Sequence, residues 1–392
     1  MFSLLLACAQ PLAPGEWGTM RWFAELKGEQ PMRLLPPATD RDGNAYVLYG
    51  DRENPESYVF TGGALGGWSG GCDAHRGNRG LHGFVGRSDS RMWFWSGDAL
   101  SVVSGETGAC REVLSADPVT GTGLYFLGVI PRVSETPSHR YLPALVQGAS
   151  DTTPFYVTMD LDEDRYFDAI RFEPEGVEAV AVAGTGADPV ADEGVFVVTY
   201  TLGEGSFTRA IFVAGDGRKR LRTLDVPEVL EEDAILGFVQ FAADGVGAAL
   251  LEDGRLLRIA RGQVFIDEIV GIEPHGVQTW NGSLYLTGLV DGMPSIQKIE
   301  ATGASGSKNW TAARQAQANL GEVSVLDERS DPALTTDWAE SSSAISAGAL
   351  LSPWPLDVYT TDSTSWLVAG PAYEAGAEPF TAVAFAPVGV SF

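Results

Sequence analysis

A group of basic side chains and histidines lies between residues 75 and 91 of an otherwise acidic chain. Guanidinium and imidazole groups bind carboxylates and other anions, and the glycines among them let backbone amides approach a ligand closely. We expect this segment to be a loop that recognises an anion or an acidic partner. The alternative is that its arginines pair with neighbouring acids at the surface. The candidate ligand-binding residues are His75, Arg76, Arg79, His82, Arg87 and Arg91.

Two other motifs match catalytic or metal-binding patterns, but their surroundings argue against both. Residues 67–71 (GWSGG) match G-x-S-x-G, in which the serine must follow a buried strand and precede a helix. Here Ser69 lies among glycines, and no helical pattern follows it. The aspartates from Asp160 to Asp164 have calcium-loop spacing, but Arg165 stands where the loop requires a glycine. We therefore predict a mobile or ligand-contacting loop at residues 67–71 and a polar hairpin turn at the aspartates. We expect no catalytic residue, no metal and no cofactor.

The cysteines offer a different kind of chemistry. Cys72 and Cys110 remain as a pair once Cys8 is set aside, and in an exported protein such a pair most simply forms one disulfide. The alternative is a zinc site that combines this pair with His75 and His82. Closed zinc sites usually show paired C-x-x-C or H-x-x-x-H ligands, and the chain lacks that spacing. We predict the disulfide.

The N-terminal segment explains why Cys8 is set aside. Leu5, Leu6 and Ala7 lead into Cys8, and a Pro-rich polar stretch follows it. This pattern resembles the bacterial lipobox, which implies a cysteine that carries lipid. The segment ahead of Cys8 has no Lys or Arg and is shorter than a complete signal peptide. Two interpretations stay open: a start codon further upstream, or an apolar leader with a free cysteine.

Composition excludes several classes of partner. The chain has 392 residues, with 52 acidic against 26 basic residues and a formal charge of −26. Such a surface repels nucleic acid and anionic lipid, so we expect neither as a direct partner. Hydrophobic residues make up 44% of the chain, which is enough for a large core. With 47 glycines and 22 prolines and few helical patterns, the composition favours strands joined by many turns.

A repeated sequence pattern predicts the fold class. Short β-branched or aromatic runs flank tight turns that contain Gly, Asn or Asp, and such turns favour hairpins. The clearest turns are at Gly43-Asn44, Asp253-Gly254, Gly262-Gln263 and Asn281-Gly282. Repeats of about 40–50 residues built from short strands are typical of a β-propeller. We predict an all-β propeller of about seven blades, with six or eight blades or tandem β-sandwiches as alternatives.

The ends of the chain and one internal segment complete the expected organisation. We assign residues 1–18 to a signal remnant and tether, and residues 19–392 to a single propeller domain. The strand near Arg21 is expected to pair with the last strand, which removes two exposed edges. A loop or short helix capped by Asn309 is expected within an insertion at 303–340. Trp93 and Trp95 share a strand face and favour packing between repeats over stacking on a sugar.

These features resemble, in a generic way, bacterial lipoproteins with β-propeller-like repeats. The resemblance implies a protein of the cell envelope, anchored through Cys8 and facing the periplasm or the cell surface. We predict a non-enzymatic binding or scaffold module that engages a protein or glycan partner. The alternatives are a propeller glycoside hydrolase or polysaccharide lyase, and a structural spacer of a cell-envelope complex. Fold alone does not choose among them.

Overall fold

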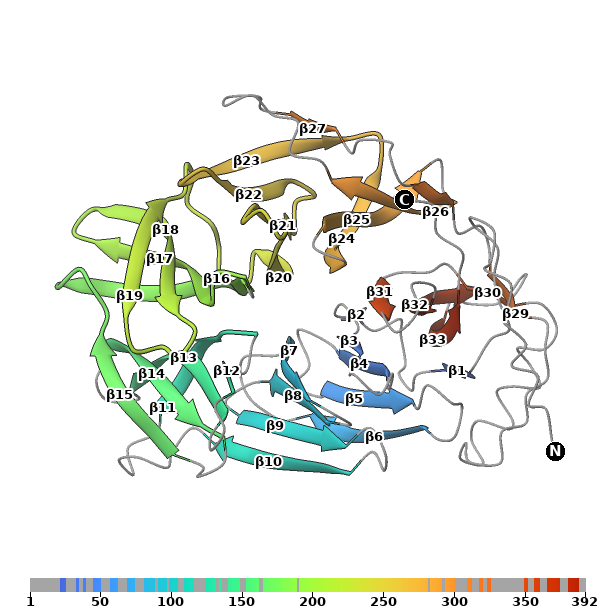
Figure 1. Cartoon of the computed structure of the whole chain (residues 1–392), viewed down its shortest axis with the longest axis horizontal. Helices are drawn as coiled ribbons and strands as arrows, with labels where there is room; N and C mark the ends of the chain where they lie inside the picture. The colour runs from blue at the N-terminus through green and yellow to red at the C-terminus, as the bar shows by residue number, and fades with distance from the viewer. Residues whose placement is uncertain are drawn as a thin grey trace, which may run out of the picture.

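The structure is a computed structural model of residues 1–392. It describes the chain at 153–161, 165–188, 190–280, 283–290 and 293–299, together with separate strands and short flanking residues between 22 and 148 and separate strands between 309 and 387. All the regular elements of these described residues are β-strands. Figure 1 shows their sheets side by side around a central axis, which is the radial arrangement of a propeller and not that of stacked sandwiches.

Antiparallel sheets form from strands that follow one another in the chain. The first sheet contains β2 (Arg33–Leu34), β3 (Ala38–Thr39), β4 (Ala45–Gly50), β5 (Ser57–Gly62) and β6 (Ser69–Ala74). The second contains β7 (Leu81–Ser88), β8 (Arg91–Ser96), β9 (Ala99–Ser104) and β10 (Cys110–Ser115). The third contains β11 (Leu124–Val129), β12 (Ser134–Glu135), β13 (Arg140–Gly148), β14 (Pro154–Asp160) and β15 (Arg165–Arg171).

Two antiparallel units join into one nine-stranded sheet. The fourth unit contains β16 (Val177–Asp188), β17 (Glu193–Leu202), β18 (Gly205–Ala214) and β19 (Arg220–Asp225). The fifth contains β20 (Ile235–Phe241), β21 (Gly247–Leu251), β22 (Leu256–Ala260) and β23 (Gln263–Val270). They meet where β16 and β20 run parallel, with Gly186 opposite Val239. These first strands of the two units lie nearest the axis (Figure 1).

The remaining strands form two further sheets and one addition to the fifth unit. The sixth sheet contains β24 (Glu273–Trp280), β25 (Ser283–Val290), β26 (Met293–Ile299) and β28 (Gln317–Asn319). β27 (Asn309–Thr311) pairs in parallel with β23. The closing sheet contains β1 (Trp22–Glu25), β29 (Val323–Val325), β30 (Ala349–Leu351), β31 (Leu356–Tyr359), β32 (Ser365–Tyr373) and β33 (Phe380–Pro387).

The closing sheet confirms one expectation, and the 303–340 segment corrects another. β1 pairs with β33, with Trp22 opposite Phe385, so strands from the two ends of the sequence share one sheet. The short helix expected after Asn309 is wrong for the residues that the structure describes there. Residues 309–311 and 317–319 are strands, and each pairs with a sheet edge. Edge hydrogen bonds to β23 and β26 satisfy this backbone in place of helical ones.

The strand sequences are apolar because both faces of a sheet are covered. In β17 (EGVFVVTYTL), Val195 and Val197 pack with residues of the fifth unit, whereas Phe196 and Val198 pack with residues of the third. A strand covered on both faces reads as a continuous hydrophobic run. Trp93 is 3% exposed and lies in the core between the second and third sheets, as predicted for packing between repeats. The side chain of Trp95 lies outside those described.

Tight turns follow the sequence signals closely, with one shift. The β22–β23 turn consists of Arg261 and Gly262, both at positive φ, one residue before the Gly262-Gln263 pair read from the sequence. A two-residue turn that needs positive φ twice tolerates a long side chain at one position when glycine fills the other. The Asp253-Gly254 turn lies between β21 and β22, with Gly254 at positive φ.

Candidate functional site

The predicted anion-binding cluster is not one loop. His82 and Arg87 belong to β7, and Arg91 begins β8, so a hairpin occupies much of the segment. The apolar residues of LHGFVGRS give this segment strand character, and it pairs with β8 instead of forming a loop. His75, Arg76 and Arg79 lie outside the described residues, as do the side chains of the other three. That these six residues bind one ligand together remains a prediction.

The roles assigned to the three cysteines, a disulfide and a lipid anchor, also remain predictions. Cys72 lies on β6 and Cys110 begins β10, so they occupy the last strands of the first and second sheets. Their side chains are not among those described, and neither the disulfide nor the zinc alternative is tested. Cys8 falls outside the described residues altogether.

The structure agrees with the rejection of the serine motif. Ser69 begins β6 and pairs with Gly62 of β5, so a strand and not a helix follows it. The loop expected at 67–71 is therefore wrong from Ser69 onward, because these residues pair with the edge of β5. Asp160 ends β14 and is buried, while Asp162 and Asp164 lie outside the described residues. Among the residues that the structure describes, no group of three or more His, Cys, Asp or Glu side chains could hold a metal. The described part of the chain also contains no helix long and apolar enough to cross a membrane.

The feature with the clearest capacity for binding is a row of aromatic rings between the third and fourth units. The ring centres are 5.9 Å apart for Tyr156 and Phe172, 5.8 Å for Phe172 and Tyr200, and 5.9 Å for Tyr200 and Phe207. We call Tyr156, Phe172, Tyr200 and Phe207 the aromatic row. Its inner three members are at most 4% exposed, but Phe207 is 44% exposed. The row therefore leads from the core to the surface.

The outer end of the row sits on a hairpin that the sequence shapes. β17 and β18 turn through Gly203 and Glu204, where Gly203 has positive φ. Tyr200 lies opposite Phe207 across the pair, so their rings share one face. Leu202 lies beside the turn and is also exposed. The Arg209 guanidinium lies 5.6 Å from the centre of the Tyr200 ring. Apolar and aromatic surface is thus presented at the hairpin tip, where it can contact a partner.

The inner end of the row contains a buried hydroxyl. The Tyr156 oxygen has no hydrogen-bond partner among the described residues, and its ring also packs on Phe196 at 5.6 Å. Burial raises the pKa of Tyr156 above its usual range, opposed by the charge of Arg220 and assisted by that of Glu173. Arg220 and Glu173 form an exposed ion pair of 3.2 Å. The phenol stays protonated at any physiological pH.

Tyr156→Phe tests the balance of forces at this hydroxyl. Since the buried oxygen has no partner, we expect the change to leave the free energy of unfolding unaltered or to raise it by up to about 1 kcal/mol. Chemical denaturation of the two proteins measures the difference. A loss of more than about 1 kcal/mol would show instead that the hydroxyl makes a stabilising hydrogen bond.

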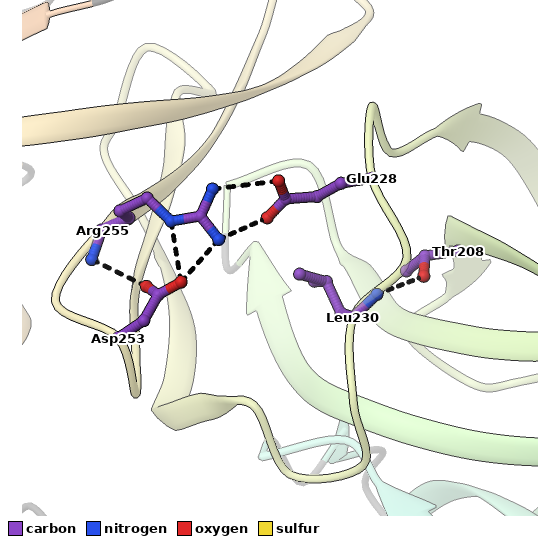
Figure 2. A network of polar contacts seen from close by, with 5 residues as sticks. All are labelled: Thr208, Glu228, Leu230, Asp253 and Arg255. Atoms are coloured by element: carbon purple, nitrogen blue, oxygen red, sulfur yellow. Dashed lines mark hydrogen bonds and ion pairs between the residues drawn. The ribbon is translucent and has the colours of Figure 1, made fainter.

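A polar network holds the connector between β19 and β20, residues 226–234, against the β17–β18 hairpin (Figure 2). The Leu230 N–H donates to the Thr208 hydroxyl at 2.8 Å, and the Thr199 hydroxyl donates to the Leu230 carbonyl at 2.7 Å. The two hydroxyls are 2.7 Å apart, so Thr208 donates to Thr199. Leu230 is thereby held buried, and the neighbouring Val229 is left 54% exposed.

Arg255, in the β21–β22 turn of the fifth unit, also binds the β19–β20 connector. Its guanidinium donates to both Glu228 carboxylate oxygens, at 2.7 and 2.9 Å, and to Asp253 (Figure 2). These hydrogen bonds raise the pKa of Arg255 above its ordinary value. Burial acts to raise the pKa of Asp253, but hydrogen bonds from Arg255 outweigh it and the pKa is lowered. The Asp253 contribution to stability is therefore present at neutral pH and is lost as pH falls through its folded-state pKa.

A second group of basic residues, at 218–222, lies at the surface. Its residues are exposed and lie in the β18–β19 turn and in β19. Arg222 pairs with Glu193 at 2.9 Å and lies 3.8 Å from the Phe212 ring centre. These are surface contacts between neighbouring strands.

Sequence reasoning missed the aromatic row and the connector network. A local signal did exist at the hairpin tip: Leu202 and Phe207 flank the Gly203–Gly205 turn, where polar residues are usual. The link from Phe207 through Tyr200 to Phe172 depends on the packing of two units, which no local pattern reports.

Antiparallel sheets arranged around an axis, with β1 closing onto β33, define the class of the fold as a β-propeller. No protein-family model and no curated protein sequence matches the chain. Solved structures with a similar fold include the Dos1 propeller, with 11% identity, TM-score 0.45, and coverage of 92% of this chain and 83% of that one. An oligogalacturonate lyase in complex with manganese has 10% identity and TM-score 0.45, covering 96% and 99%.

Regucalcin from Agrobacterium tumefaciens, described as a calcium-binding protein, is also similar. It has 15% identity and TM-score 0.39, with coverage of 68% of this chain and 85% of that chain. The similar structures thus include an enzyme and a calcium-binding protein. At such identities and TM-scores they identify neither a family nor an activity for this chain.

Proposed function

We propose that the chain is a binding or scaffold propeller of seven blades that engages a partner through the end of the ring where the β17–β18 turn lies. Each of the first to sixth units and the closing sheet is one blade in this proposal. The observation that carries it is the aromatic row, which opens to solvent at Phe207 beside Leu202. Large apolar side chains that gather at one exposed place mark interaction sites in soluble proteins.

The residues around this surface are held in place by hydrogen bonds and by burial, which favours a rigid binding surface. The β19–β20 connector is tied to both neighbouring units by Thr208 and Arg255. The row itself is buried up to its last ring. A rigid surface loses little conformational entropy when a partner docks, which favours recognition.

We further propose that the module works in the cell envelope, anchored by lipid at Cys8, with a protein or glycan as its partner. This part rests on the sequence pattern around Cys8 and on the acidic composition. Cys8→Ser is expected to release the protein from membranes.

Comparative co-purification tests the binding surface. We expect the parent protein, isolated from its native membranes, to retain a stoichiometric partner that Leu202→Ser with Phe207→Ser loses. The matched control is Val190→Ser with Leu221→Ser, because both residues are exposed apolar side chains away from the β17–β18 turn. Equal retention by both double variants, with the fold intact by circular dichroism, would overturn the proposal.

A further inference from the structure

Exposed apolar side chains collect at one end of the fourth and fifth units. Antiparallel pairing within each unit and parallel pairing of β16 with β20 put the connectors 172–176, 226–234 and 271–272 at the same end as the β17–β18 and β21–β22 turns. We call this the connector end. Of the six large exposed hydrophobic residues described, Leu202, Phe207, Val229 and Val270 lie there.

Charge separates the connector end from the opposite end. Residues 172–176, 203–204, 226–234 and 252–255 carry nine carboxylates and one arginine, and that arginine is already bound to Glu228 and Asp253. One more of the nine, Glu173, pairs with Arg220 of β19. The opposite end of the same two units consists of residues 190–192, 215–219, 242–246 and 261–262. It carries three acidic and three basic residues. The excess of negative charge therefore lies at the same end as the exposed apolar residues and not at the opposite end.

We propose that the connector end binds a basic segment of a partner protein that carries apolar side chains among its lysines or arginines. This inference rests on the proposed binding function and gives the partner its chemistry. The apolar side chains contact Phe207 and Leu202, while the basic ones meet the surrounding carboxylates. Charge complementarity raises the association rate and selects the partner, and burial at the aromatic row supplies the affinity.

The charge pattern distinguishes this partner from a neutral glycan. A sugar ring could stack on Phe207. A neutral sugar, however, gains no electrostatic attraction from the nine carboxylates at the connector end. A second copy of the chain would bring its own acidic end, and like charges at an interface cost free energy. Of these three partners, only a cationic segment with apolar side chains is attracted both by the negative charge of the connector end and by its exposed apolar residues.

Peptide titration tests the proposal. The probe is a fluorescein-labelled peptide of alternating lysine and leucine, and its affinity for the parent is measured by fluorescence anisotropy at low and high salt. We expect Leu202→Ser with Phe207→Ser to weaken binding about tenfold. The control pair Val190→Ser with Leu221→Ser is expected to bind like the parent. A lysine–serine peptide and a glutamate–leucine peptide are expected to bind much more weakly.

A second pair of variants isolates the charge. Glu204→Gln with Glu231→Gln is expected to flatten the salt dependence of binding, whereas Asp192→Asn with Asp244→Asn, at the opposite end, leaves it unchanged. Both pairs remove two negative charges, so a difference between them reports location and not net charge.

Two outcomes would overturn the inference. Equal salt dependence in both charge pairs would show that the peptide responds to net charge alone. Equal binding of the glutamate–leucine peptide would show that charge plays no part. If co-purification still depends on Leu202 and Phe207 in either case, the proposed binding function stands and only the cationic partner is wrong.

Discussion

Asp267→Asn is expected to lower the free energy of unfolding by about 3–5 kcal/mol, because it removes a buried negative charge that is hydrogen-bonded to the buried Arg258 guanidinium. Arg258 Nε lies 2.7 Å from Asp267 Oδ2, and the side chains are 7% and 1% exposed. The Arg258 guanidinium also lies 4.2 Å from the Phe265 ring centre. Removing the Asp267 charge leaves less compensation for the cost of burying the Arg258 guanidinium.

Two controls separate burial from charge. The double variant Arg258→Met with Asp267→Leu removes both charges together and is expected to unfold within about 1 kcal/mol of the parent. Asp225→Asn breaks the exposed Arg209–Asp225 pair and is expected to cost less than about 1 kcal/mol. Denaturant unfolding curves with equal slopes provide the comparison. A single variant as stable as the parent would contradict this account of the pair.

Gly186→Ala is expected to cost about 3 kcal/mol, since the added methyl group would strike the backbone of the neighbouring unit. A Cβ at this position would lie 2.6 Å from the Val239 Cβ and would also meet the Val239 carbonyl oxygen. The clash falls on the parallel β16–β20 pair that joins the fourth and fifth units. Backbone cannot move aside as a flexible side chain can, so the junction itself must open.

The control for this substitution lies in the β20–β21 turn. Gly245→Ala meets nothing within 4 Å and carries only the strain of positive φ, which is about 1 kcal/mol. Thermal unfolding of both variants ranks them. If Gly245→Ala proves the more damaging, close packing at the β16–β20 junction is not what makes Gly186 necessary.

The fold could be predicted from sequence wherever a turn signal and a strand pattern agree. The Asn281-Gly282 dipeptide separates Trp280 from Ser283, which pair across the ends of β24 and β25. Strand β27 could not be predicted in this way, because Asn309 pairs with Glu268 of β23, which lies 41 residues earlier in the chain. Helix propensity at such a segment yields to an open sheet edge elsewhere in the fold.

The candidate site was harder to predict than the fold. Tyr156 and Phe207 belong to different units, and only the packing of those units links them through Phe172 and Tyr200. The charge of −26 is evident from composition, but its concentration at the connector end depends on strand direction. Sequence reasoning instead favoured the basic cluster at 75–91, which is conspicuous because it is rare in this chain.

Photo-crosslinking tests the central claim, that the connector end is the partner surface, most directly. A photoreactive phenylalanine analogue replaces Phe207 in one protein and Leu221 in another, and both are irradiated in native membranes. Leu221 is 40% exposed and Phe207 is 44% exposed, so random encounters label them equally. A discrete adduct from position 207 and none from position 221 is the predicted result. The same adduct from both positions, or an adduct from position 221 alone, would contradict it.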